Sequence, residues 1–438
     1  MDNEQQQPRK EDLTNPLRIF KNRDYALYFG GQLISQVGTW MQQIALSWLT
    51  YKLTSSAVLL AVVGASGQIP SLVIMPFAGV IADRFNRHRI VLITQAAAML
   101  QAGILAYLTL TNQIQIWYLI ALGLAMGVIN AFDMPVRSAF VYDMVKTKED
   151  LPAAVAMNAS LMNTSRLIGP ALAGFVVAAF GEGICFLLNS LSYIAVIGSL
   201  SFVRGNFDPT NNKKANVFTE LKEGFSYAMS TSPIRAIILY LAAFGFGGMA
   251  YAMLLPVFVT EIGGNADTLG YLSAASALGS TLGTFILATR KKVVGMGNWI
   301  VGSSFVYALA IFGFGLTHSL WPAMFALCLL GAAMMLQMGC CNTILQSLVD
   351  QDKRGRVMSL FTMAFMGTVP LGSLLAGSIS NQFGFHNMLF ACGSYCLVVA
   401  ATFAYLLPRL RNEGRGLYVQ RGLLEAEEEL ETITKPNA

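Results

Sequence analysis

The chain has 438 residues, of which 55% are hydrophobic and only 12% charged, with a formal net charge of +5. Its mean hydropathy is +0.54. Soluble domains carry about 25% charged residues, so this composition excludes an ordinary soluble protein and predicts a polytopic membrane protein. The expected partners are a lipid bilayer and a small-molecule substrate, and nucleic acid is not among them.

Polar residues dominate the beginning of the chain. Residues 1–24 are rich in Gln, Lys, Arg and acidic side chains, which predicts a disordered cytoplasmic segment with one interfacial turn at Leu17–Phe20. A signal peptide with a small-residue cleavage site is not expected here.

The apolar stretches that follow predict an all-α membrane protein with twelve transmembrane helices in two six-helix bundles. The first bundle covers residues 25–203, with helices at 25–50, 58–81, 89–111, 116–141, 152–180 and 183–203. The second covers residues 235–407, with helices at 235–260, 267–289, 298–316, 320–346, 356–380 and 386–407. The linker 204–234 between them contains an amphipathic segment, Phe218–Met229, which we expect at the inner membrane surface. The acidic tail 408–438 is expected to be cytoplasmic.

The distribution of basic residues predicts the orientation. On this map 27 of the 29 Lys and Arg residues fall on one side of the membrane, and the exceptions are Lys52 and Arg166. Basic residues concentrate in cytoplasmic loops, so both termini are predicted to be cytoplasmic. Twelve spans, an even number, agree with this alternation.

The short turn after the second predicted helix joins two apolar stretches and is strongly basic. Between Gly79 and Arg89 the residues follow the order Gly-x-x-x-Asp-Arg-x-x-Arg-x-Arg, with Asn86 where Gly is usual. This order resembles the cytoplasmic loop motif of the major facilitator superfamily, a family of transporters. The resemblance implies a gating role for Asp83, Arg84 and Arg87. The simpler alternative is that the loop only orients the chain.

The two halves also repeat each other. The stretch Arg166–Gly174 matches Val369–Gly377 at an offset of 203 residues, as expected of a transporter built from two related bundles. Further stretches resemble the branch of the superfamily that contains macrolide efflux pumps and the enterobactin exporter; they are Ser35–Trp40, Pro135–Arg137, Gly169–Gly174 and Arg354–Leu360. This resemblance implies proton-driven export of amphipathic compounds. Many members have Asp where this chain has Thr39, so a proton-binding acid of the first helix is missing.

Charged residues deep in predicted membrane helices are few and therefore informative, because a charge in hydrocarbon costs about 2.5–3.5 kcal/mol on insertion scales. Asp133 is the only deep acid, and Arg166 lies far inside the fifth helix. Two pairs are open, Asp133 with Arg166 or Asp133 with Arg137. The pair is either a fixed structural contact or a proton-coupling site. Pro135 disturbs the helix between Asp133 and Arg137 and is expected to weaken the local pair.

A narrow polar stripe marks the first helix. Gln32, Gln36, Thr39 and Gln43 fall on one face at helical spacing, which predicts contact with water or substrate. The alternative is that the stripe makes only interhelical hydrogen bonds. By the resemblance, in which four helices surround the pathway, the same cavity would also be lined by Asn130, Tyr240, Tyr251, Gln337 and Asn342. Arg166 lies on the face of the fifth helix that points into the bundle, and it is a further candidate for substrate binding.

These observations predict a secondary active transporter of the bacterial inner membrane, and not an enzyme. It would export a siderophore or drug-like compound by proton antiport through alternating access, as a monomer and with the proton gradient as its only energy source. An importer of a carboxylate siderophore or nutrient, or a lipid-translocating carrier, is the alternative. All six Cys fall in predicted apolar helices and all three His at helix ends or loops, so neither a disulfide nor a metal site is expected.

Overall fold

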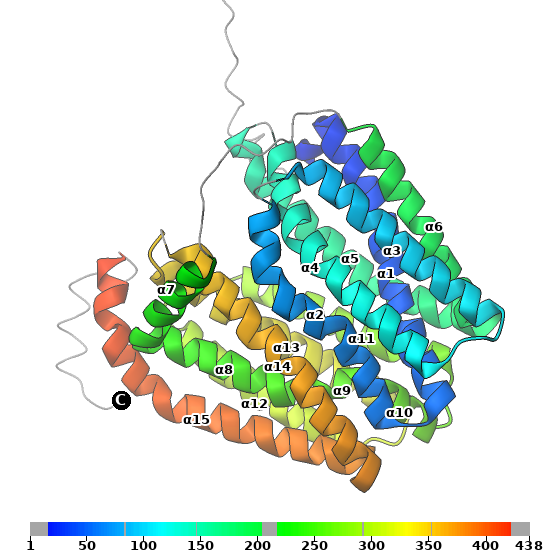
Figure 1. The fold of residues 1–438 in the computed structure, drawn as a ribbon. Coiled ribbons are helices and arrows are strands. Elements are labelled where there is room, and N and C mark those ends of the chain that lie inside the picture. Colours follow the sequence, from blue (N-terminus) through cyan, green and yellow to red (C-terminus); the bar gives the residue numbers. More distant parts are fainter. Residues whose placement is uncertain are drawn as a thin grey trace, which may run out of the picture. The chain divides into compact units, whose positions relative to one another are not determined.

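The computed structural model describes residues 16–82, 85–145, 147–203, 217–290, 293–351 and 353–421, and every regular element in these ranges is a helix (Figure 1). The chain divides into two compact units. Unit 1 comprises Met1–Leu53 and Ile69–Lys214, and unit 2 comprises Thr54–Gln68 and Ala215–Ala438. The second predicted helix therefore begins in unit 2 and ends in unit 1, whereas the sequence-based division placed it in the first bundle.

The described elements before residue 204 are two short 3-10 turns and six long helices. They are η1 (Pro16–Lys21), α1 (Arg23–Thr54), α2 (Ala57–Ala82), α3 (Arg87–Leu110), α4 (Ile116–Met144), η2 (Lys148–Asp150), α5 (Leu151–Phe180) and α6 (Glu182–Ser201). The turn predicted at Leu17–Phe20 is confirmed as η1, which packs on α5.

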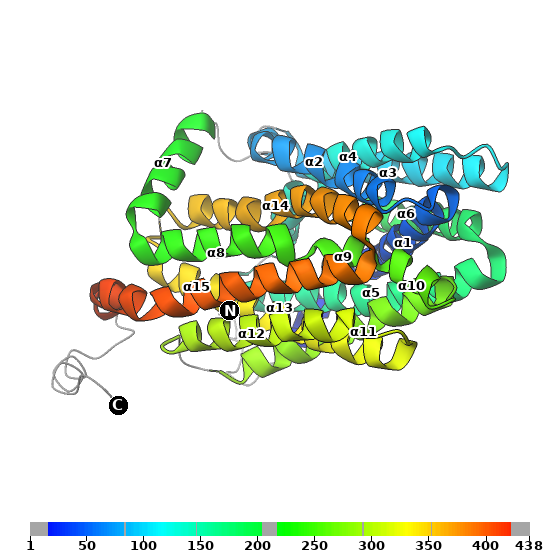
Figure 2. The same cartoon turned by 90° about the horizontal axis from the view of Figure 1, so that it is seen from below.

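The elements after residue 216 begin with the helix predicted in the linker. They are α7 (Val217–Ser230), α8 (Ser232–Gly248), α9 (Ala250–Met253), α10 (Leu255–Glu261), α11 (Ala266–Ala288), α12 (Met296–Gly315), α13 (Leu320–Leu348), α14 (Arg354–Phe383) and α15 (Phe385–Gln420). Figure 2 shows α7 standing across the direction of α8 and α14, at the end where α8 begins. Residues 204–216 of the linker lie outside the described ranges.

Two predicted helices differ from the structure by more than a shift of a few residues at their ends. The segment 235–260 is divided into α8, α9 and α10, because a Gly pair ends α8 and Pro256 lies in the first turn of α10. The Tyr307 hydroxyl donates to the freed carbonyl of Gly248 at 2.7 Å, which compensates the break. The last helix was expected to end at residue 407, but α15 continues through Pro408 to Gln420.

Eleven of the described helices are long and apolar enough to cross a membrane. Among the long helices, α1 is not in this set, because Gln32, Gln36, Gln42 and Gln43 lower its hydropathy. The all-helical membrane class is thus confirmed, while the twelfth span and the cytoplasmic position of both termini remain predictions.

Close helix contacts bring α1 into its place in unit 1. A Cβ on Gly31 would lie 2.9 Å from the Val196 Cα of α6, and one on Gly38 would lie 3.2 Å from the Asn189 Cα. Only glycine permits this approach of the two backbones. One face of α1 consequently packs against α6, and Gln32, Gln36 and Gln42 of α1 lie among helices α3 to α6.

Candidate functional site

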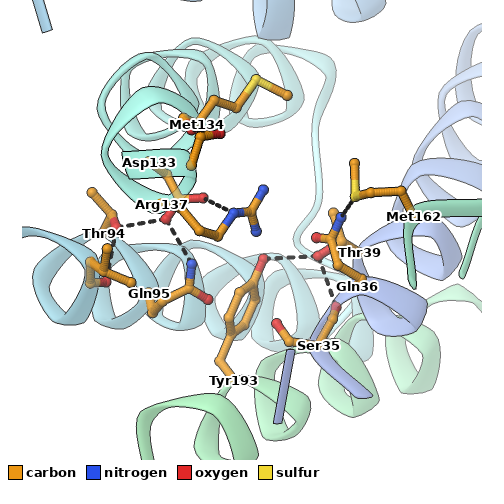
Figure 3. Close-up of polar contacts among 12 residues, drawn as sticks. Ser35, Gln36, Thr39, Thr94, Gln95, Asp133, Met134, Arg137, Met162 and Tyr193 are labelled. Atoms are coloured by element: carbon orange, nitrogen blue, oxygen red, sulfur yellow. Dashed lines mark hydrogen bonds and ion pairs between the residues drawn. The ribbon is translucent and has the colours of Figure 1, made fainter. Parts of the chain in front are cut away.

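Asp133 of α4 lies at the centre of a buried polar cluster in unit 1 (Figure 3). It is 4% exposed, and its Oδ1 accepts hydrogen bonds from the Thr94 hydroxyl and the Gln95 amide of α3, each at 2.8 Å. Its Oδ2 lies 3.4 Å from Nε of Arg137, one helical turn further along α4. One cation and two hydrogen-bond donors thus surround this buried carboxylate.

The structure therefore selects Arg137 as the ion-pair partner of Asp133. Pro135 lies between the two, yet α4 runs without interruption through it, so the expected weakening does not prevent the pair. Arg166 instead places its guanidinium over the Trp40 ring, 6.0 Å from the ring centroid. The Asp133–Arg137 pair has no net formal charge.

A cavity of about 200 Å³ borders this cluster within unit 1. Its polar lining includes Gln32, Arg137 and Asn158, which come from α1, α4 and α5. Its other lining residues are Tyr28, Met134, Ser138, Val141, Leu161 and Met162. In Figure 3 the guanidinium of Arg137 lies on the opposite side of the Asp133 carboxylate from Thr94 and Gln95.

The polar stripe predicted on α1 separates into different environments. Gln32 lines the cavity and is 1% exposed, whereas Gln43 is exposed. Gln36 donates to the sulfur of Met162 at 3.0 Å. The Thr39 hydroxyl donates to the Ser35 carbonyl at 3.0 Å and lies 3.3 Å from the Tyr193 hydroxyl.

Three buried polar residues that the stripe did not include form a network beside it. Gln42 donates to Gln101 at 3.1 Å and accepts from Asn189 at 2.8 Å. The reason is geometric: α1 is packed on α3 and α6 on the side of Gln42, so that Gln43, its neighbour in sequence, points outward.

Sequence reasoning also missed the two donors to Asp133. Thr94 and Gln95 are adjacent polar residues in the otherwise apolar stretch 90–100 of α3, and this was an available signal. Nothing in the sequence alone indicated that they lie at the depth of Asp133.

The predicted cavity residues of unit 2 do not form one site. Tyr240 and Gln337 are hydrogen-bonded to each other, and Ser304 joins them with its Oγ 2.6 Å from the Tyr240 hydroxyl. Tyr251 is buried and packs edge-on against Phe314. Asn342 borders a separate polar hollow of about 470 Å³, together with Thr343, Gln346, Ser347 and Arg354. Asn130, in unit 1, is half-buried on α4.

One of the three predicted gating residues, Arg87, lies in the described ranges, and it pairs with the end of a neighbouring helix. Nη1 of Arg87 lies 2.9 Å from both carboxylate oxygens of Asp143, in the last turn of α4. Asp83 and Arg84 lie outside the described residues. Whether this loop gates transport remains a prediction.

The fold resembles solved transporters of low sequence identity. A bacterial homologue of the human lysosomal transporter Spinster, in an inward-facing conformation, gives a TM-score of 0.71 at 14% identity, covering 89% of this chain and 97% of that one. The nucleoside transporter NupG gives 0.70 at 13% identity, covering 88% and 99%. These likenesses show that the chain has the same overall fold as these solved transporters.

The sequence matches the family described as transmembrane secretion effector over residues 14–420, and the chain belongs to this family of the major facilitator superfamily. It is 27% identical to the staphyloferrin A transporter of Staphylococcus aureus, over 88% of this chain and 96% of that protein. It is 20% identical to macrolide efflux protein A of Streptococcus pyogenes, over 87% and 95%. The multidrug efflux pump Tap of Mycolicibacterium fortuitum is 23% identical, over 87% and 94%. The resemblance found in the sequence is confirmed: this is a secondary transporter, and its relatives serve siderophore transport and drug efflux.

Proposed function

We propose that this protein exports an amphipathic small molecule, a siderophore or a drug-like compound, across the bacterial inner membrane in exchange for protons. It works as a monomer, by alternating access, and the proton gradient is its energy source. Relatives named for staphyloferrin A transport and for macrolide and multidrug efflux support this range of substrates.

The observation that carries the proposal is the environment of Asp133. Arg137, Thr94 and Gln95 contact its carboxylate in a buried site beside a cavity. When a proton binds the carboxylate, Arg137 loses its counter-charge and the buried pair becomes unbalanced. The protonated Asp133 beside a charged Arg137 and the neutral Asp133–Arg137 ion pair are therefore two alternative states of one site. Exchange of a proton for a substrate requires such alternative states.

The test is transport in everted membrane vesicles with an acidic lumen, with staphyloferrin A and a macrolide as test compounds. The wild-type protein accumulates at least one of them in the lumen, and collapse of the pH gradient abolishes accumulation. Asp133→Asn should lose gradient-driven accumulation at least tenfold while downhill exchange continues. Asp267→Asn, at the start of α11, is the control of matched chemistry and keeps wild-type transport.

Two results would overturn the proposal. Gradient-driven accumulation in intact cells, but not in everted vesicles, would identify an importer. Unchanged dependence on the gradient in a normally folded Asp133→Asn protein would make the pair purely structural.

A further inference from the structure

Gln32 is an unusual residue for a membrane helix, because its amide is buried without a hydrogen bond. It is 1% exposed, and neither Nε2 nor Oε1 has a hydrogen-bond partner among the described residues. An amide buried in this way costs about 1–3 kcal/mol. Because the side chain lines the cavity of about 200 Å³, a group that enters the cavity can supply both missing partners.

Arg137 presents further donors to the same space. Its Nε faces Asp133, and its terminal nitrogens have no hydrogen bond with the residues that the structure describes. A guanidinium carries five N–H donors, so most of its capacity is left for a ligand. Asn158 of α5 adds a second amide to the lining.

We propose that this cavity binds the carboxamide-type group of the substrate, a C=O next to an N–H, through reciprocal hydrogen bonds with Gln32. The ligand's carbonyl accepts from Gln32 Nε2 and from Arg137, and its N–H donates to Gln32 Oε1. A primary amide or a lactam has this arrangement. The inference rests on the proposed function, since it names the chemistry of the exported compound.

The charges of the site favour an uncharged group over a carboxylate. Arg137 is the only charged side chain in the lining, and Asp133 already neutralises it. A carboxylate has no N–H for Gln32 Oε1, which would stay unpaired. It would also compete with Asp133 for Arg137 and so favour proton uptake together with substrate, which opposes exchange.

The size of the cavity shows which part of the compound it takes. Sites for drug-sized ligands occupy about 300–1,000 Å³, so about 200 Å³ holds one end of a larger molecule. Met134, Leu161 and Met162 supply apolar contacts for the carbon atoms next to the amide.

The test compares three probes of equal chain length, octanamide, octanoate and methyl octanoate, by thermal shift of the full-length protein purified in detergent. Octanamide should bind at least about tenfold more tightly than either of the others, which is about 1.4 kcal/mol. Gln32→Leu should keep or raise the Tm without ligand, because two unpartnered polar atoms are removed, and should abolish the response to octanamide. Gln43→Leu, the same change at an exposed position of α1, should preserve that response.

If Gln32→Leu does not fold, Gln32→Met gives the same test with a side chain of similar shape. Three results would overturn the proposal. Octanoate could bind more strongly than octanamide, or the response to octanamide could survive in the Gln32 variants. The third is a large loss of Tm in both Gln32 variants without ligand. Binding is measured here without a gradient, so failure of proton-coupled export leaves this result intact. Conversely, an absent amide site leaves Asp133-dependent exchange unaffected.

Discussion

At the scale of single residues, the state of Asp133 depends on neighbours that are far away in the sequence. Thr94 and Gln95 come from α3, one helix earlier, and each donates to the same carboxylate oxygen. Hydrogen bonds to a charged group contribute about 1.5–3 kcal/mol each. These two donors and Arg137 together offset the cost of burying the charge.

Replacing Thr94 by valine tests this account. Thr94→Val keeps the shape of the side chain but removes one donor, so the free energy of unfolding should fall by about 1.5–3 kcal/mol. Thr109→Val on the same helix is the control, because the Thr109 hydroxyl bonds only to the Leu105 carbonyl of its own helix. The measurement is the Tm of the purified proteins. Equal shifts for both variants would show that Thr94 contributes nothing through Asp133.

At the scale of elements, a set of polar contacts holds the linker helix α7 against other elements of unit 2. The Tyr227 hydroxyl donates to Asp350 at 3.2 Å, and Arg421 forms an ion pair with the same carboxylate. Arg356 pairs with Glu223 of α7 at 2.6 Å. The contacts therefore join α7, the α13–α14 connection and the end of α15.

The pKa of Asp350 determines how this attachment responds to pH. The hydrogen bond from Arg421 is the main cause that lowers this pKa below its ordinary value, and the Tyr227 hydroxyl adds to it. The stabilising contribution of a carboxylate with a lowered pKa is complete above the ordinary pKa, about 3.9, and is lost as pH falls through the folded-state value. Hydrogen exchange of α7, corrected for the intrinsic rate, should thus be unchanged between about pH 8 and pH 5.

Asp350→Asn should reproduce the acid effect at neutral pH. The charge is lost while the shape is kept, so α7 should exchange faster than in the wild-type protein. Asp267→Asn, elsewhere in unit 2, should leave α7 unchanged. Protection of α7 that is equal in all three proteins would show that Asp350 does not hold it.

Helix packing in unit 2 makes a second prediction at this scale. A Cβ on Gly372 of α14 would overlap the Phe246 carbonyl oxygen of α8, and backbone cannot rotate away. Gly372→Ala should therefore destabilise the protein by about 1–3 kcal/mol or more. At Gly302 of α12 nothing lies within 4 Å of the added atom, so Gly302→Ala should be neutral or stabilise by up to about 1 kcal/mol. The yield and Tm of folded protein compare the two, and an undisturbed Gly372→Ala protein would contradict the packing.

At the scale of the whole molecule, the open question is which side of the membrane each loop faces, and whether α1 crosses it. The sequence predicts that residues joining α1 to α2, and α3 to α4, are external. Ser55 and Asn112 are exposed in these two connections, and Thr147 and Gln351 are exposed in connections predicted to be cytoplasmic.

Cysteine labelling in intact cells decides the orientation. In a variant with the six native Cys replaced by Ala, Ser55→Cys and Asn112→Cys should react with a membrane-impermeant reagent. Thr147→Cys and Gln351→Cys should react only after permeabilisation. Labelling of Lys21→Cys, before α1, on the same side as Ser55→Cys would show that α1 does not cross, and the reverse pattern overall would invert the topology.

The sequence by itself determined the class of the protein, the existence of its helices and the presence of one deep acid. Hydropathy and helical spacing are local properties, and a membrane enforces them because unpaired backbone groups in hydrocarbon are costly. Even the linker helix and the turn at Leu17–Phe20 followed from local pattern.

Only the tertiary structure decided what each polar side chain meets. It paired Asp133 with Arg137 and placed Arg166 against Trp40, because the depth and rotation of neighbouring helices fix which charges come within reach. It separated Gln42 from Gln43 and left Gln32 facing a cavity, since small residues set how closely α1 approaches α6. A stripe on an isolated helix gives the direction of its residues, whereas their partners depend on the other helices that surround it.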